Sequence, residues 1–116
     1  MQEKHIRPWG YYTNLQSGEC FLVKCIVVHP KSKLSVQYHH HRKEHWVVLE
    51  GKAVVVKGDN ILTLEIGEYV DIDIKEIHSL QNPYDETLKV LEIQRGCILD
   101  ENDIVRIEDI YGRTDA

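Results

Sequence analysis

Apolar and polar residues alternate along much of this chain with a period of two. Val70, Ile72 and Ile74 alternate with aspartates, which is the pattern of a strand with one face in a core and the other in water. Similar short apolar segments recur, and turns rich in Gly, Pro, Asn and Asp separate them. The predicted strands are Phe21–Val28, Trp46–Leu49, Ala53–Val56, Ile61–Ile66, Tyr69–Ile74 and Leu88–Ile93. Short strands joined by short turns predict an all-β fold, either an antiparallel sandwich or a small barrel.

The two ends of the chain have a different character. Residues 1–15 include the aromatic run Arg7–Tyr12, which we expect to form an arm across an edge of the barrel. In the tail, residues 99–116, the polar run Asp100–Asp103 precedes Ile104–Ile107, which predicts a short capped helical turn. No linker or internal repeat interrupts the chain, so we expect residues 1–116 to form a single domain.

Composition and charge exclude several classes of protein. The 116 residues carry 14 Lys and Arg against 19 Asp and Glu, a formal net charge of −5. An acidic chain argues against a nucleic-acid or membrane-surface binder, because both need a basic face. No apolar run approaches the ~20 residues of a transmembrane helix, and the first residues lack the apolar core of a secretory signal. Three cysteines without a C-x-x-C pair predict reduced thiols, so we expect a cytoplasmic protein.

Four of the seven histidines fall between positions 39 and 45, and this cluster suggests a metal site. Gln37 and His39 are two residues apart, so on a strand they share a face. Glu44 follows the turn on the next strand, and His78 ends a later strand that could close the group from across the barrel. Two imidazoles and two side-chain oxygens suit one divalent ion, zinc first, with iron, cobalt, nickel or manganese as alternatives. Judged from the local sequence alone, a solvated polar turn explains the histidine run equally well.

The spacing of these residues resembles the two-part motif of the cupins. The first half fits as Lys31-x5-Gln37-x-His39-x4-Glu44-x6-Gly51, with Lys31 in place of a glycine and Gln37 in place of a histidine. The second half fits as Gly67-x5-Asp73-x-Lys75-x2-His78-x3-Asn82, with Asp73 and Lys75 in place of a proline and a glycine. The resemblance implies a double-stranded β-helix, a jelly-roll-like antiparallel barrel. It also implies that Gln37, His39, Glu44 and His78 are the metal ligands.

Within the cupins, the sequence is most similar to the C-terminal isomerase domain of type II phosphomannose isomerases. The segments RPWGYY, QYHHHRKEHW, LQNP, LEIQRG and DIVRIEDIYGR carry this likeness, from about Arg7 to Arg113. In that branch a glutamine at the first ligand position is the rule. Most relatives fuse the domain to a mannose-1-phosphate guanylyltransferase, whose Gly-rich nucleotide loop does not occur in this sequence. We therefore expect no GDP-mannose synthesis by this chain alone.

The resemblance implies a metal-dependent enzyme that interconverts mannose 6-phosphate and fructose 6-phosphate, in mannose and polysaccharide precursor metabolism. This reaction needs a base that moves a proton between C1 and C2. His45, beside Glu44, and Glu92, on a late strand, are both candidates, although strict alternation points His45 outward if Glu44 points inward. The phosphate needs a cation, for which Arg42 is the first choice. Weaker candidates are Arg95, Arg106 and Lys31.

Two other functional classes remain open at this point. The chain could bind a metal or a sugar without turnover, or it could be the partner subunit of a separately encoded nucleotidyltransferase. A homodimer is also expected, because the strand Phe21–Val28 and the arm offer faces and edges that an isolated small barrel would leave open.

Overall fold

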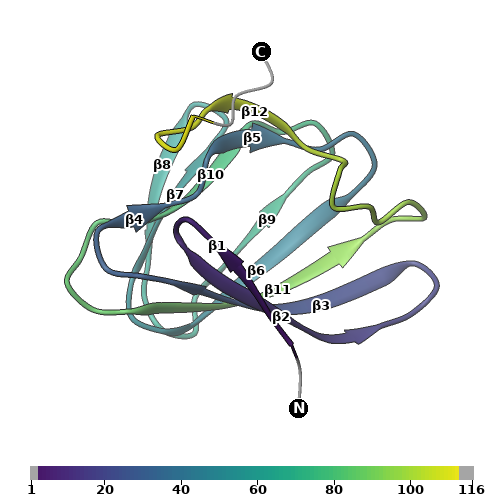
Figure 1. The fold of residues 1–116 in the computed structure, drawn as a ribbon. Coiled ribbons are helices and arrows are strands. Elements are labelled where there is room, and N and C mark those ends of the chain that lie inside the picture. The colour runs from purple at the N-terminus through teal and green to yellow at the C-terminus, as the bar shows by residue number, and fades with distance from the viewer. Residues whose placement is uncertain (1–2, 113–116) are drawn as a thin grey trace.

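Two antiparallel sheets face each other in the computed structural model, which describes residues 3–112 (Figure 1). The first sheet has the order β1 (Lys4–Arg7), β2 (Gly10–Ser17), β3 (Phe21–Val28), β11 (Leu88–Arg95), β6 (Lys43–Glu50) and β9 (Tyr69–Ile72). The second has the order β12 (Val105–Glu108), β5 (Val36–Tyr38), β10 (His78–Asn82), β7 (Ala53–Lys57) and β8 (Asn60–Leu64), with β4 (Ser32–Lys33) paired to β10. The predicted all-β architecture is confirmed, since residues 3–112 contain no helix, and none that could cross a membrane.

The inward faces of the strands divide the interior into an apolar part and a polar part. Along β11 every second residue is buried: Leu88 and Val90 belong to the hydrophobic core, and Glu92 and Gln94 continue the same face. On the neighbouring β6, Val48 lies in the core near one end, and Glu44 is buried near the other. The period-two pattern that forms the core therefore also carries polar side chains into one end of the barrel.

The N-terminal segment is part of the first sheet. β1 and β2 form a hairpin whose second strand pairs with β3 over most of its length. Trp9 and Tyr12 are buried in the core. The first two residues of the predicted arm and the last four of the predicted tail, Arg113 among them, lie outside the described residues.

The predicted C-terminal helical turn is wrong. Asp100 does cap a turn, because its side chain accepts the backbone N–H of Asn102 at 2.9 Å, but no helix follows. The chain instead enters β12, which pairs antiparallel with β5 at the edge of the second sheet. The β-branched residues Val105 and Ile107 favour a strand, and β5 offers an unpaired edge that this strand covers.

His78 also lies differently in its strand from the prediction. The preceding strand, β9, stops at Ile72, and His78 is the first residue of β10. The turn between them passes through Lys75 at a φ of 61°, and Lys31 has a φ of 58°. Lys31 and Lys75 have left-handed backbone conformations and occupy two of the positions at which the cupin motif has glycine, the residue that adopts such a backbone without strain.

Candidate metal centre

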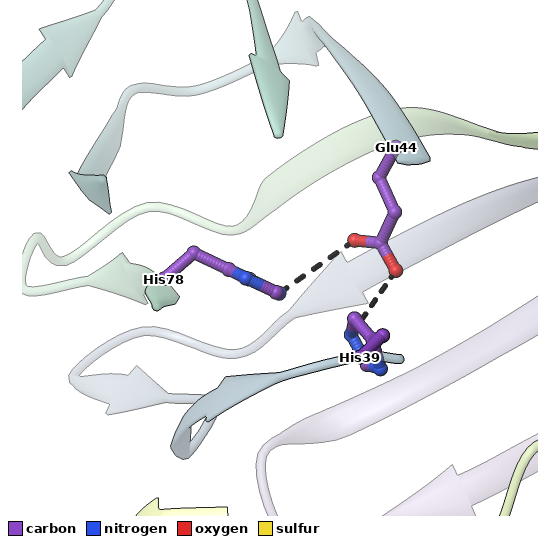
Figure 2. A group of neighbouring side chains, drawn as sticks. All are labelled: His39, Glu44 and His78. Carbon is purple, nitrogen blue, oxygen red and sulfur yellow. Dashed lines mark ion pairs between the residues drawn. The ribbon is translucent and has the colours of Figure 1, made fainter. Parts of the chain in front are cut away.

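Three predicted ligands meet inside the barrel. His39 follows β5, Glu44 lies on β6, and His78 begins β10; all three side chains are at most 3% exposed. Their candidate ligand atoms lie within 4.8 Å of one another, so the group could hold a metal ion. In Figure 2 the Glu44 carboxylate points toward both imidazoles, with Oε2 3.2 Å from Nε2 of His39 and Oε1 3.8 Å from Nε2 of His78.

Backbone carbonyls orient both imidazoles. Nδ1 of His39 lies 2.6 Å from the carbonyl oxygen of Asp103, and Nδ1 of His78 lies 2.8 Å from that of Glu76. Because a carbonyl oxygen only accepts hydrogen bonds, each Nδ1 carries the proton and each Nε2 presents a lone pair toward Glu44. Nε2 of His78 is buried and has no hydrogen-bond partner among the described residues. This uncompensated lone pair fits a metal ligand, since buried polar atoms are otherwise nearly always satisfied.

His39 is held neutral, as ligation requires. Burial, together with the nearby Arg42 guanidinium, lowers its pKa to about 4. A neutral imidazole keeps the lone pair that a divalent cation needs.

Gln37, the fourth predicted ligand, lies in the same part of the interior. It is 7% exposed, and its backbone is paired directly opposite that of His78 across β5 and β10. Residues directly opposite each other in an antiparallel pair point to the same face, so Gln37 faces the interior beside His78. Gln37 also lines the cavity next to the metal group.

Arg42 lies against the ligands rather than in a separate site. Its Nε donates to Oε2 of Glu44 at 2.7 Å, and its Nη2 lies 3.3 Å from Nε2 of His39. Burial acts to lower the pKa of Arg42, but the carboxylates of Glu44 and Glu92 raise it above its ordinary value. Nη1 is buried without a hydrogen-bond partner in the part of the chain that is described. Arg42 therefore places a permanent cation, with a donor to spare, beside the metal group.

Glu92 is the second carboxylate of the interior. The indole N–H of Trp46 lies 3.0 Å from Oε2 of Glu92 and 3.1 Å from Oε1 of Glu44, so it bridges the two carboxylates. Gln94 donates its amide N–H to Oε1 of Glu92 at 2.7 Å. Burial and the nearby Glu44 charge raise the pKa of Glu92 to about 7, even though Lys24 and Arg42 act in the opposite direction. A carboxyl group with this pKa can both accept and release a proton near neutral pH.

His45 is not brought together with these residues. Alternation along β6 places it on the outer face, where its Nδ1 lies 2.6 Å from Oδ1 of Asp71. Arg95 lines an outer depression together with His45, and Lys31 forms an exposed ion pair with Asp85. Of the weaker candidates for phosphate binding, Arg106 alone lines the inner cavity.

A cavity of about 230 Å³ opens next to the metal group, and some of the residues that line it were not identified from the sequence. Arg7, Tyr12, Lys24 and Glu101 all line it. One signal pointed to Lys24, because it is the only charged residue in the otherwise apolar run Phe21–Val28. Glu101 gave no signal, since it reaches the cavity from a turn 77 positions away from Lys24.

Asp103 is the other residue that sequence reasoning missed. Its carboxylate accepts the backbone N–H groups of His40 and His41 at 2.8 and 2.9 Å. The side chains of His40 and His41 are exposed. The histidine run thus contains one buried candidate ligand, His39, followed by two residues whose backbone is fixed by Asp103.

Comparison with known proteins finds relatives along nearly the whole chain. The family model described as mannose-6-phosphate isomerase C-terminal matches residues 1–109. The xanthan biosynthesis protein XanB of Xanthomonas campestris pv. campestris is 47% identical over 111 residues, which cover 96% of this chain and 24% of that protein. The mannose-1-phosphate guanylyltransferase RfbM of Salmonella typhimurium is 46% identical over 106 residues, 91% of this chain and 22% of that protein. The chain thus spans about a quarter of the length of these relatives.

A solved structure shows the same fold. A sugar phosphate isomerase from a cupin superfamily of Silicibacter pomeroyi matches with a TM-score of 0.63 at 21% identity, over 72% of this chain and 59% of that chain. The predicted cupin fold is confirmed by this likeness.

Proposed function

The chain belongs to the mannose-6-phosphate isomerase C-terminal family, and we propose that its cavity interconverts mannose 6-phosphate and fructose 6-phosphate with one bound divalent metal ion. The observation that carries this proposal is the position of Glu92. A buried carboxyl group with a pKa of about 7 shares the Trp46 indole N–H with Glu44, one of the candidate metal ligands. A proton-transfer group and a Lewis-acid site beside one cavity are what an aldose–ketose isomerisation needs.

His39, Glu44 and His78 would hold the ion, with Gln37 as the fourth ligand. When bound, the metal supplies a Lewis acid that stabilises negative charge on the sugar oxygens. Two imidazole nitrogens, a carboxylate and an amide suit zinc best, and also accept iron, cobalt, nickel or manganese.

Glu92 takes the proton from one carbon of the substrate and returns it to its neighbour. In its ionised form it abstracts the C2 proton of mannose 6-phosphate, and as the resulting acid it delivers this proton to C1. The hydroxyl proton of O2 passes to O1 of the same sugar, so that C1 becomes an alcohol carbon and C2 a ketone. Trp46 and Gln94 hold one carboxylate oxygen each, which fixes the direction of the group. We assign this step to Glu92 rather than His45, since His45 lies on the outer face of β6 beside Asp71.

Arg42 acts as a cation on the substrate. Its guanidinium keeps Glu44 in place through Nε, and the unpaired Nη1 is a donor for a sugar oxygen. Because Arg42 is 7% exposed and its Nε is already bound to Glu44, we place the phosphate group, which was first assigned to Arg42, elsewhere in the cavity.

A coupled assay that detects fructose 6-phosphate tests the proposal. Metal-stripped protein is expected to gain activity when zinc or another divalent ion is restored. Glu92→Gln is expected to lose about 100-fold in kcat or more, the usual contribution of a general base, with the metal content unchanged. His40→Ala is the matched control, because the side chain of His40 is exposed. Full activity of Glu92→Gln would remove Glu92 from the mechanism.

A second candidate function follows from the share of the relatives that the chain covers. Because it spans 22–24% of proteins such as XanB and RfbM, it could serve as the partner subunit of a separate nucleotidyltransferase, or bind a metal or sugar without turnover. Co-purification with a nucleotidyltransferase, in the absence of isomerase activity, would favour the partner role. A metal-loaded protein with neither property would favour simple binding.

The homodimer and the cytoplasmic location are also part of the proposal. Exposed apolar side chains such as Ile61 (74%), Ile66 (67%) and Tyr69 (62%) offer surface that a second copy could cover. Light scattering at micromolar concentration is expected to give twice the chain mass, and a monomeric mass would contradict it. Cell fractionation tests the location.

A further inference from the structure

Lys24 is a buried cation in the wall of the cavity. It is 4% exposed on the inner face of β3. Its Nζ lies 2.5 Å from Oε2 of Glu101 and 4.0 Å from the centroid of the Tyr12 ring. An ammonium group removed from water needs an anion close to it, and here Glu101 supplies that anion.

The Glu101 carboxylate lies in a cradle of donors. Tyr12 donates its hydroxyl hydrogen to Oε1 of Glu101 at 3.1 Å, and Arg7 donates from Nη2 to the oxygen of Tyr12 at 3.2 Å. Each carboxylate oxygen thus has a donor of its own. Burial acts to raise the pKa of Glu101, but Lys24 overcomes this and holds the pKa below its ordinary value, so the group is an anion at neutral pH.

The two members of this ion pair are buried to very different degrees. The side chain of Lys24 is 5% exposed, whereas that of Glu101 is 49% exposed. Glu101 also comes from the turn between β11 and β12, outside both sheets. Glu101 is therefore the member of the pair that can turn into water when another anion replaces it, while Lys24 is fixed in the wall and needs an anion near it.

The cradle lies beside the reacting groups. Lys24 on β3 is paired directly opposite Glu92 on β11, so the two side chains share the inner face. Arg42 is close enough to Glu101 to influence its pKa. Residues of both the cradle and the metal group line the same cavity.

We propose that Lys24 and Tyr12, backed by Arg7, form the subsite for the phosphate group of the substrate, and that Glu101 occupies this subsite until a phosphate displaces it. This inference rests on the proposed function, since it gives the phosphate of the sugar its place. A phosphate monoester carries more negative charge than a carboxylate and offers three oxygens, so it can satisfy both donors at once. When it binds, Glu101 turns outward into water. The cradle then selects phosphorylated sugars over free sugars.

The subsite is tested directly by isothermal titration calorimetry, in which the protein is titrated with inorganic phosphate. Glu101→Gln removes the competing charge and is expected to tighten phosphate binding about three- to tenfold. Lys24→Met keeps the length of the side chain and is expected to weaken binding about tenfold or more. Lys89→Met is the matched control, because Lys89 forms a similar ion pair with Glu50 at 2.8 Å on the outside and should leave the affinity unchanged. If Glu101→Gln binds phosphate no more tightly than the wild type, Glu101 is only a structural partner of Lys24 and the proposal fails.

Tyr12→Phe covers the case in which Lys24→Met does not fold. It keeps the buried ring and removes only the hydroxyl donor, so a weaker affinity for phosphate is expected in this variant too. If Tyr12→Phe and wild type bind inorganic phosphate with equal affinity, the proposed subsite is refuted.

Kinetics separate this inference from the proposed function. If mannose 6-phosphate is turned over with the same KM by wild type, Lys24→Met and Tyr12→Phe, the function stands and the phosphate subsite is refuted. If phosphate binding follows the expected order but no isomerase activity is found, the subsite stands and the isomerase function is refuted.

Discussion

Asp103 and His39 are joined across 64 positions of the sequence, because the carbonyl oxygen of Asp103 accepts the Nδ1 proton of His39 at 2.6 Å. The Asp103 carboxylate also accepts the backbone N–H groups of His40 and His41. One residue of the C-terminal segment therefore fixes both the tautomer of a candidate ligand and the turn that follows it. Partners of this kind, behind the ligand, keep the ring orientation that a metal needs.

Asp103→Ala is expected to weaken metal binding about tenfold or more, the usual effect of losing a group that orients a ligand. The carbonyl oxygen remains in the variant, but the turn that positions it loses two charge-assisted hydrogen bonds. Competition with a chelator measures the affinity. Asp100→Ala is the control, since Asp100 caps Asn102 in the same turn without contacting the histidines. If Asp100→Ala and Asp103→Ala lose the same metal affinity, the effect comes from a general change in the turn Asp100–Asp103 and not from the contacts of Asp103 with the histidines.

Glu92 gives the protein a pH-dependent stability. The native pKa of about 7 exceeds the ordinary value of 4.5, so between these values the folded protein holds a proton that the unfolded chain has lost. The contribution of Glu92 to stability is therefore complete below pH 4.5 and disappears as the pH rises through 7.

Glu92→Gln cannot titrate, so its free energy of unfolding relative to wild type is expected to rise between pH 5 and pH 8, by on the order of 1–3 kcal/mol. Denaturant unfolding of the metal-free proteins at both pH values measures this difference. The comparison between variant and wild type removes the contribution of other titrating groups. A constant difference would contradict a raised pKa for Glu92.

Lys31 and Lys75 adopt backbone conformations that favour glycine, with φ values of 58° and 61°. A Cβ atom costs about 1–2 kcal/mol in this region of the backbone. Lys31→Gly removes this cost, but glycine loses more conformational entropy on folding, so we expect a net stabilisation of about 1 kcal/mol. Loss of the exposed ion pair with Asp85 should cost little. Lys31→Ala retains a Cβ and should give no gain. Thermal unfolding distinguishes the two variants.

Local pattern was sufficient to predict much of the fold. The run Phe21–Val28 became β3 with the same bounds, because a continuous β-branched segment has few alternatives to a buried strand. By contrast, β10 was missed, since Ser79, Gln81 and Asn82 look like loop residues. Their side chains bond to the backbone or to each other; for example, the two N–H groups of the Asn82 amide are shared among three backbone carbonyl oxygens within 3.2 Å. Tertiary contacts of this kind leave no periodic trace in the sequence.

The metal group was predictable to the extent that its members are close in sequence. Gln37, His39 and Glu44 lie within a few residues of one another, and His78 was added by motif spacing. Lys24 and Glu101 are 77 positions apart, and only the closed barrel brings them together. The helical turn expected after Asp103 failed for a related reason, because the Asp side chain serves the His40–His41 turn instead of a helix N-terminus.

The proposed proton transfer on the sugar can be observed directly by ¹H NMR. Zinc-loaded protein is incubated with mannose 6-phosphate in D₂O, and ¹H NMR follows the C2 proton of the substrate together with the formation of fructose 6-phosphate. Wild type is expected to produce fructose 6-phosphate and to exchange carbon-bound protons with solvent, and His78→Ala, which lacks a ligand, is expected to do neither. A wild-type protein that holds one metal ion per chain, yet neither forms fructose 6-phosphate nor exchanges protons, would contradict the account.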